Sequence, residues 1–333
     1  MALKAADELR HPYDKSDFNW RESLYFNFND PVSGIGGWLY LWVVPNKPQP
    51  SGMLVSFYKG PWPEPSIMDE AATRPGHIIV DGDRWLYCVK QDVDYLMNQD
   101  FDDVELNGLK FKRIEPLKRY ALSFADDAGN GFEIDASFMV EPYDYADGAN
   151  PSPPWIAANR YHRSWSAKGE LRINGTTYPL NCTGDSDHSW GKRDMDVFGA
   201  TLFKMWSFQT ADARTSISAV QIEDGDQQID LGFLHKDGQV GSIVRIESSA
   251  SYDQHGVQRN VDLTVTDALG RTIHGTCAEM TSYLGLGGPA RKSWGYEGVG
   301  EYRVDGLGAV PGLVSYFWPM KLTPAQLHAG ETG

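Results

Sequence analysis

One short stretch of the chain gathers most of the side chains that could carry acid–base chemistry. Residues 184–194 read GDSDHSWGKRD, so carboxylates, an imidazole, a guanidinium and an indole follow one another closely. On an extended strand, successive side chains point to opposite faces. Asp185 and Asp187 would then share one face, while His188 and Trp190 share the other. The carboxylates are therefore expected opposite the imidazole and the indole, unless a bulge re-aims one of them.

A structural and a catalytic interpretation of this block are both open. In the structural one, the aspartates cap turns, Arg193 pairs with Asp185 or Asp194, and Trp190 fills the core. In the catalytic one, a partly desolvated aspartate or histidine delivers or removes a proton beside an aromatic wall. The two interpretations differ in whether the carboxylates lie in a dry pocket or face water.

A metal site is the third interpretation. Asp185, Asp187 and His188 offer carboxylate and imidazole ligands, and His162, in the segment YHRSW, starts an alternating strand that could face the same cavity. No ligand triad in this set has the spacing that is diagnostic of a metal site. We therefore expect no metal, and nothing in the sequence indicates a redox or organic cofactor.

Short β-type runs separated by turn dipeptides make up most of the chain. Asn174-Gly175 and Asp237-Gly238 each lie between two strand-like runs, and such pairs supply the positive φ angles of a tight hairpin turn. Helical signals are limited to residues 65–74 and 323–328. Turns at this close and regular spacing predict an all-β protein made of antiparallel barrels or sandwiches.

A segment rich in proline, glycine, aspartate and asparagine, EPYDYADGANPSPPW at residues 141–155, interrupts the strand pattern. Such a composition pairs poorly within a sheet. We therefore expect two β domains in sequence, with residues 1–145 in the first, 146–155 as the linker and 156–333 in the second. Both parts have the size of an ordinary domain.

Charge and cysteine content exclude several classes of function. The net charge is -15 and no lysine or arginine stripe forms, so nucleic-acid binding is not expected. The first residues lack a signal-type apolar core and no run is as long as a membrane span, which predicts a cytoplasmic protein. The three cysteines are far apart and form no CxxC pair, and the sequence does not indicate an oligomeric state.

The layout and the block together resemble a known family. The proline-rich link, the run YHRSW, the hairpin LRING, the block GDSDHSWGKRD and the aromatic strand after it are similar to the AttH/carotenoid 1,2-hydratase-like superfamily. The resemblance implies two lipocalin-like β domains in series. It also implies a hydratase, dehydratase, cyclase or isomerase that acts on a hydrophobic, isoprenoid- or terpenoid-like small molecule.

The resemblance also points to individual residues. In the hydratase branch, a His-x-Trp step and a later Tyr-x-Asp step build the site; His188-Ser189-Trp190 matches the first, and residues 214–220 lack the second. Two carboxylates this close cannot both ionise cheaply in a dry pocket, so one of Asp185 and Asp187 is expected to stay protonated as the acid. His188 would take up the final proton. The expected substrate-binding residues are Trp190, Trp165 and Trp206, as aromatic walls for a cation, with His162 and Arg193.

A non-catalytic carrier of lipophilic ligands is the alternative from a different class, because barrels of this kind can hold an apolar molecule without reacting with it. A carrier would leave the block GDSDHSWGKRD on the surface. A catalyst would point at least one of Asp185, Asp187 or His188 inward.

Overall fold

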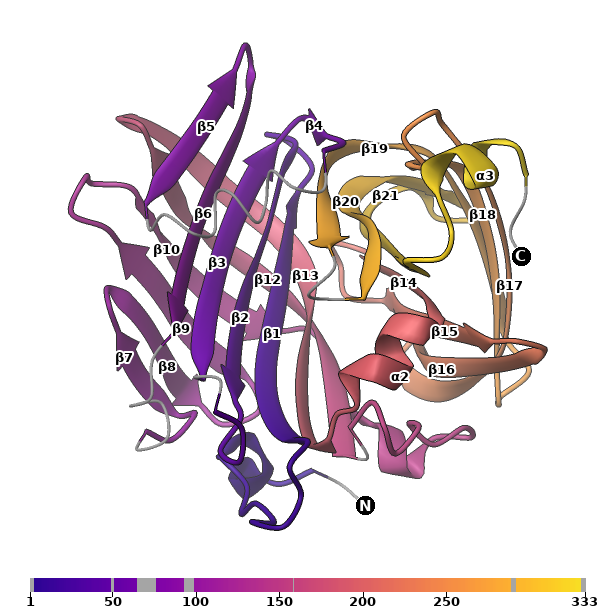
Figure 1. Cartoon of the computed structure of the whole chain (residues 1–333), viewed down its shortest axis with the longest axis horizontal. Helices are drawn as coiled ribbons and strands as arrows, with labels where there is room; N and C mark the ends of the chain where they lie inside the picture. Colours follow the sequence, from indigo (N-terminus) through magenta and orange to yellow (C-terminus); the bar gives the residue numbers. More distant parts are fainter. Residues whose placement is uncertain are drawn as a thin grey trace.

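The chain folds into two antiparallel β-sheets that pack against each other, as the computed structural model in Figure 1 shows. The structure describes residues 3–48, 51–64, 76–92, 99–157, 159–288 and 292–330. Strand makes up 65% of the structure and helix 6%, so the predicted all-β fold class with two lipocalin-like units is confirmed. No helix in these ranges is long and apolar enough to cross a membrane.

The first sheet is a curled half-barrel of 12 strands within the described residues. Its strands follow the order β5-β6-β3-β2-β1-β13-β12-β10-β9-β8-β7, with β11 paired to β12. Their bounds are β1 Trp20–Asp30, β2 Ile35–Val43, β3 Gly52–Lys59, β5 His77–Asp81, β6 Arg84–Asp92, β7 Asp103–Leu106, β8 Leu109–Glu115, β9 Arg119–Ala125, β10 Gly131–Phe138, β11 Tyr143–Asp144, β12 Asn159–Ile173 and β13 Thr176–Lys192.

The second sheet closes into an 8-stranded barrel, because its end strands β18 and β19 pair with each other. The short strand β4 (Pro61–Trp62) of the first half of the chain adds to β19 in parallel. The other bounds are β14 Leu202–Gln209, β15 Thr215–Asp224, β16 Gln227–Lys236, β17 Gln239–Tyr252, β18 Gln258–Asp267, β19 Thr272–Gly288, β20 Ser293–Val304 and β21 Gly308–Pro319.

The point at which the chain changes sheet differs from the expected linker. β12 and β13 follow residues 146–155, yet both pair within the first sheet, β13 with β1 and β12 with β10. The change comes after β13, at the short helix α2 (Met195–Ala200), whose N-terminus is capped by Asp194. The segment 146–155 therefore connects β11 to β12 within one unit, and its composition marked a loop rather than a domain boundary.

The local turn and helix predictions have clear outcomes. Asn174-Gly175 and Asp237-Gly238 adopt positive φ angles and join the hairpins β12–β13 and β16–β17, as predicted. Helix α3 (Pro324–His328) is capped by Thr323, as the signal at 323–328 predicts. The helix expected at 65–74 lies outside the described residues. Within the described residues, the remaining helical elements are the single turns η1 (Ala5–Glu8) and η3 (Tyr145–Asp147).

The central strands of the first sheet carry two different faces. Side chains such as Leu24, Phe26 and Trp165 point into the hydrophobic core of the half-barrel, and we call this the inner face. The alternate side chains point toward the barrel, and we call this the inter-sheet face. Apolar residues of both sheets form one cluster there, for example Tyr143 with Leu313. Each of the strands β1, β12 and β13 therefore has both of its faces largely buried.

Candidate functional site

Strand register, rather than sequence proximity, assembles a polar row on the inter-sheet face. His162 on β12 lies opposite Asp187 on β13, and Asp187 lies opposite Tyr25 on β1, which in turn faces Tyr40 on β2. Since alternate residues share a face, Asp185 lies on this same face, two residues from Asp187. The predicted separation of the carboxylates from His188 and Trp190 is thus what the strand geometry produces.

His162 lies between the two carboxylates of the block. Its Nδ1 is 3.2 Å from Oδ2 of Asp185 and its Nε2 is 3.2 Å from Oδ2 of Asp187. Ser218 of the barrel donates a hydrogen bond of 2.6 Å to the same oxygen of Asp185. Arg160 pairs with Asp187 at 3.1 Å. A group from the second sheet thereby completes a cluster that the first sheet begins.

The charged groups of this cluster shift one another's pKa values. Burial disfavours the charged imidazole, but Asp185 and Asp187 outweigh that cost and raise the pKa of His162. Burial also opposes ionisation of Asp187, but Arg160, His162 and Arg193 together hold its pKa well below the ordinary value. The expectation of a proton shared by like charges therefore fails for Asp187. The two carboxylates therefore favour the protonated form of the imidazole that lies between them.

Several buried polar atoms around the cluster lack a hydrogen-bond partner within the protein. They include the Tyr145 hydroxyl and the second oxygen of Asp185, in residues that are each 1% exposed. The Tyr145 ring stands 5.1 Å from that of His162, and burial keeps the pKa of this phenol well above its ordinary value. Buried polar groups are normally satisfied. An unpartnered neutral hydroxyl and an unpartnered carboxylate oxygen can therefore bind a ligand or water.

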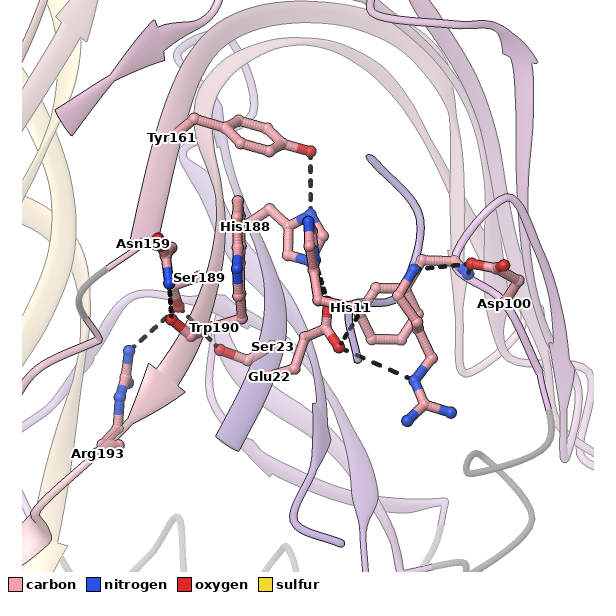
Figure 2. A network of polar contacts seen from close by, with 12 residues as sticks. His11, Glu22, Ser23, Asp100, Asn159, Tyr161, His188, Ser189, Trp190 and Arg193 are labelled. Atoms are coloured by element: carbon pink, nitrogen blue, oxygen red, sulfur yellow. Dashed lines mark hydrogen bonds and ion pairs between the residues drawn. The ribbon is translucent and has the colours of Figure 1, made fainter. Parts of the chain in front are cut away.

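The inner face of the same strands holds a second polar network, shown in Figure 2. Nε2 of His188 lies 2.9 Å from Oε1 of Glu22, and Nδ1 of His11 lies 2.8 Å from the same oxygen. The Tyr161 hydroxyl is 3.0 Å from the other ring nitrogen of His188. His11 stacks on Trp190 with ring centroids 3.7 Å apart. Both nitrogens of His188 are thus occupied.

In this second network, the pKa shifts favour a neutral His188 and an ionised Glu22. Burial lowers the pKa of His188 despite the neighbouring Glu22. The two imidazoles outweigh the burial of Glu22 and lower the pKa of that carboxyl. A neutral imidazole beside an ionised carboxylate is the form in which these groups bind metals. Among the described residues, His11, Glu22 and His188 are the group whose ligand atoms could hold an ion, whereas Asp185, Asp187 and His162 lie across the sheet from His188.

The expected aromatic walls lie in three different places. Trp165 packs edge-on against Phe26 in the core of the first sheet. Trp206 fills the interior of the barrel and donates a hydrogen bond to Tyr316. Trp190 belongs to the inner face. None of them borders the carboxylate cluster, because side-chain alternation or the fold of the second sheet turns each one away. The aromatic residues of the inter-sheet layer include Tyr25, Tyr40, Trp38, Trp42, Phe203 and Phe317.

Sequence reasoning missed Glu22, His11, Tyr145 and Ser218. Glu22, His11 and Ser218 are brought to β12 and β13 by long-range pairing or packing, which no local sequence pattern predicts. Tyr145 has one signal: Tyr145-Ala146-Asp147 is a Tyr-x-Asp step, ahead of the His-x-Trp step rather than after it. Arg193, expected to pair with Asp185 or Asp194, instead donates to the hydroxyl of Ser189 at 3.2 Å.

Comparison with known proteins assigns the family. Residues 4–313 match the family described as "Domain of unknown function (DUF7064)". The chain belongs to this family. No curated protein matches it in sequence.

Solved structures share the two-sheet architecture. A protein provisionally designated AttH from Nitrosomonas europaea has a TM-score of 0.59 at 16% identity, over 95% of this chain and 96% of its own. Kievitone hydratase from Nectria haematococca has a TM-score of 0.52 at 9% identity, over 90% and 89%. CghA, solved with Sch210972, has a TM-score of 0.52 at 9% identity, over 92% and 89%. The chain thus has the AttH-like fold, a fold that a hydratase also uses; these identities say nothing further about its reaction.

Proposed function

We propose that this protein is an acid–base enzyme that adds water to, removes water from, or cyclises a hydrophobic, isoprenoid-like small molecule in the layer between its two sheets. The observation that carries the proposal is the imidazole of His162 held between Asp185 and Asp187, with both nitrogens within 3.2 Å of a carboxylate. Perturbed titratable groups that depend on one another are typical of sites that move protons.

The proposed roles follow from exposure and charge. Asp187 is the more accessible carboxylate, with 13% of its side chain exposed compared with 1% for Asp185. An ionised carboxylate with access to the layer acts as the base that removes a proton from substrate or water. When the imidazole of His162 is neutral, its Nε2 receives that proton through the hydrogen bond to Asp187, and Asp185 with Ser218 stabilises the imidazolium that forms.

The acid on the opposite side of the reaction is the Tyr145 hydroxyl. It stays protonated, belongs to a ring that packs against His162 and has no hydrogen-bond partner within the protein. In dehydration it can donate its proton to the oxygen of the leaving hydroxyl group while Asp187 removes a proton from the neighbouring carbon, and hydration is the reverse of these two transfers. Cationic character that develops on the carbon skeleton would be stabilised by aromatic faces of the layer, such as Tyr25 and Phe317, by about 0.5–2 kcal/mol each.

The non-catalytic carrier remains the rival, and two observations weigh against it. Asp185 and His188 are 1% and 0% exposed, so the block is not a surface clasp. The interior of the barrel, where a carrier would hold its ligand, is filled by side chains such as Trp206, Tyr302 and Tyr316.

Mass spectrometry of the molecule that the purified protein retains from cell extract tests the proposal. Incubation of that molecule with the enzyme in heavy-oxygen water should change its mass by one water, exchange its oxygen, or alter its ring count. Asp187→Asn should retain the molecule but slow its conversion by about 100-fold. Asp305→Asn changes a surface carboxylate beside His274 and serves as the control. Retention without any conversion by the wild-type protein would identify a carrier.

A further inference from the structure

Two arginines on the inter-sheet side are partly buried and have no carboxylate partner among the described residues. Among the described residues, every arginine lies within 4.0 Å of a carboxylate except Arg21, Arg193 and Arg303. Arg303 is exposed to solvent, which stabilises its charge. Arg21 and Arg193 are only partly exposed, so their missing counter-ion calls for a physical explanation.

Both guanidinium groups are held by neutral partners. Arg21 donates a hydrogen bond of 2.8 Å to the Tyr40 hydroxyl and lies over the Tyr40 and Trp42 rings. Arg193 donates to the Ser189 hydroxyl at 3.2 Å and to a backbone carbonyl at 3.4 Å. The Nε atoms of both arginines are buried and make no hydrogen bond. These contacts fix the two side chains in place without neutralising them.

The neighbouring carboxylate is already engaged. Asp187 pairs with Arg160 at 3.1 Å and with His162 at 3.2 Å. The positive charges of Arg21 and Arg193 act on the Tyr40 phenol. Burial opposes ionisation of Tyr40, but the two arginines outweigh burial and lower the pKa of this phenol. Burial and the repulsion from neighbouring arginines lower the pKa of Arg193 to about 10, against attraction to Tyr40.

We propose that Arg21, Arg193 and Tyr40 form a subsite for a carboxylate group of the substrate, so that the substrate is an amphiphilic acid with an apolar body. The proposal rests on the proposed function, since it places the subsite at the edge of the same layer. The strand register supports that placement. On the inter-sheet face, the pair Asp187–Tyr25 is followed two residues along the strands by the pair Ser189–Ser23, and Arg21 lies two residues beyond Ser23. A carboxylate would accept two parallel hydrogen bonds from a guanidinium, the geometry that arginine provides. The apolar body would then lie along the partly exposed Tyr25, Trp42 and Phe317.

A matched pair of fluorescent probes tests the subsite: 1-pyrenebutyric acid, which is an anion at neutral pH, and the neutral 1-pyrenebutanol. Wild-type protein should bind the acid about tenfold or more tightly than the alcohol. Arg193→Gln and, independently, Arg21→Gln should remove that preference and leave the affinity for the alcohol unchanged. Arg193→Lys should restore part of it, and the exposed Arg303→Gln should change neither affinity. Melting temperatures of all variants establish that each is folded.

The outcomes separate the two proposals. Trp42→Ala removes an aromatic surface of the layer and should weaken both probes alike, which places the pyrene there. Equal affinity of acid and alcohol in the wild type, or an acid preference that survives both arginine changes, would overturn the carboxylate subsite while the ligand site stands. Failure of both probes to bind would overturn the subsite and the proposed function together.

Discussion

The two faces of the same three strands place histidines in opposite electrostatic situations. His188 on the inner face shares one carboxylate, Glu22, with His11, and has the cation of Arg163 nearby. His162, on the neighbouring strand but on the other face, stands between two carboxylates. Burial is equal, at 0% and 2% exposure, so charge balance alone separates the lowered pKa of His188 from the raised pKa of His162.

The groups of the two networks also differ in their hydrogen bonding. On the inner face, both nitrogens of His188 and the shared oxygen of Glu22 have partners. On the inter-sheet face, groups of the site itself, Tyr145 and Asp185, keep buried polar atoms without a hydrogen bond, whereas on the inner face such atoms belong to side chains outside the His188–Glu22–His11 network, such as Trp165 and Ser186. A satisfied buried network rigidifies a fold, whereas an incompletely satisfied one costs stability and persists where function needs it. We therefore assign stability to the inner face and chemistry to the inter-sheet face.

The largest expected effect is on turnover. His162→Gln removes the titratable imidazole while keeping a side chain of similar length. It should slow conversion of the retained molecule by about 100-fold or more. His274 is a matched control, because it also lies between two carboxylates, Asp262 and Asp305, but at the surface. His274→Gln should leave turnover unchanged. Equal losses in the two variants would show that the effect does not depend on the inter-sheet layer.

The next effect is on stability. Glu22→Gln replaces the buried carboxylate that accepts from His188 and from two groups of His11, and should lower the free energy of unfolding by about 3 kcal/mol, as measured by denaturant titration. Glu247→Gln, in an exposed ion pair with Arg245, should change it by less than about 1 kcal/mol. A loss no greater for Glu22→Gln than for Glu247→Gln would contradict a stabilising inner network.

The smallest effect is a pH dependence of opposite sign for the two histidines. The raised pKa of His162 adds stability that is fully present below its unfolded pKa of 6.5 and is lost as pH rises through the folded value. The lowered pKa of His188 adds stability that is present above 6.5 and is lost as pH falls through the folded value. The penalty of His162→Gln should therefore shrink as pH rises, while that of His188→Gln grows, by at most about 1.4 kcal/mol per pH unit. Parallel pH profiles for the two variants would remove the distinction between the faces.

Much of the architecture follows from local sequence signals. The hairpins at Asn174-Gly175 and Asp237-Gly238 need positive φ angles, and the alternation in the block fixes which side chains share a face. The placement of β12 and β13 in the first sheet could not be predicted, because the proline-rich segment 146–155 has the composition of either a loop or a linker. Which strand pairs with which is decided by packing over the whole chain.

The candidate site was predictable in part. Asp185, Asp187 and His162 do converge, since the strand pairing brings His162 opposite Asp187. Trp165 and Trp206 were expected to line the site because tryptophan can form an aromatic wall. Residue type alone does not predict location, and each of them fills a different hydrophobic core. Tyr145 lies in a segment without strand or helix periodicity, so only the folded structure brings its ring next to that of His162.

The central claim, that chemistry belongs to the inter-sheet face and stability to the inner face, is tested most directly by a side-by-side measurement on two adjacent residues. Turnover of the retained molecule and the melting temperature would be measured for Asp187→Asn and His188→Gln. We predict that Asp187→Asn loses about 100-fold in turnover per folded molecule, and that His188→Gln melts earlier while its folded fraction turns over normally. Loss of turnover in His188→Gln alone, with Asp187→Asn fully active, would contradict the claim.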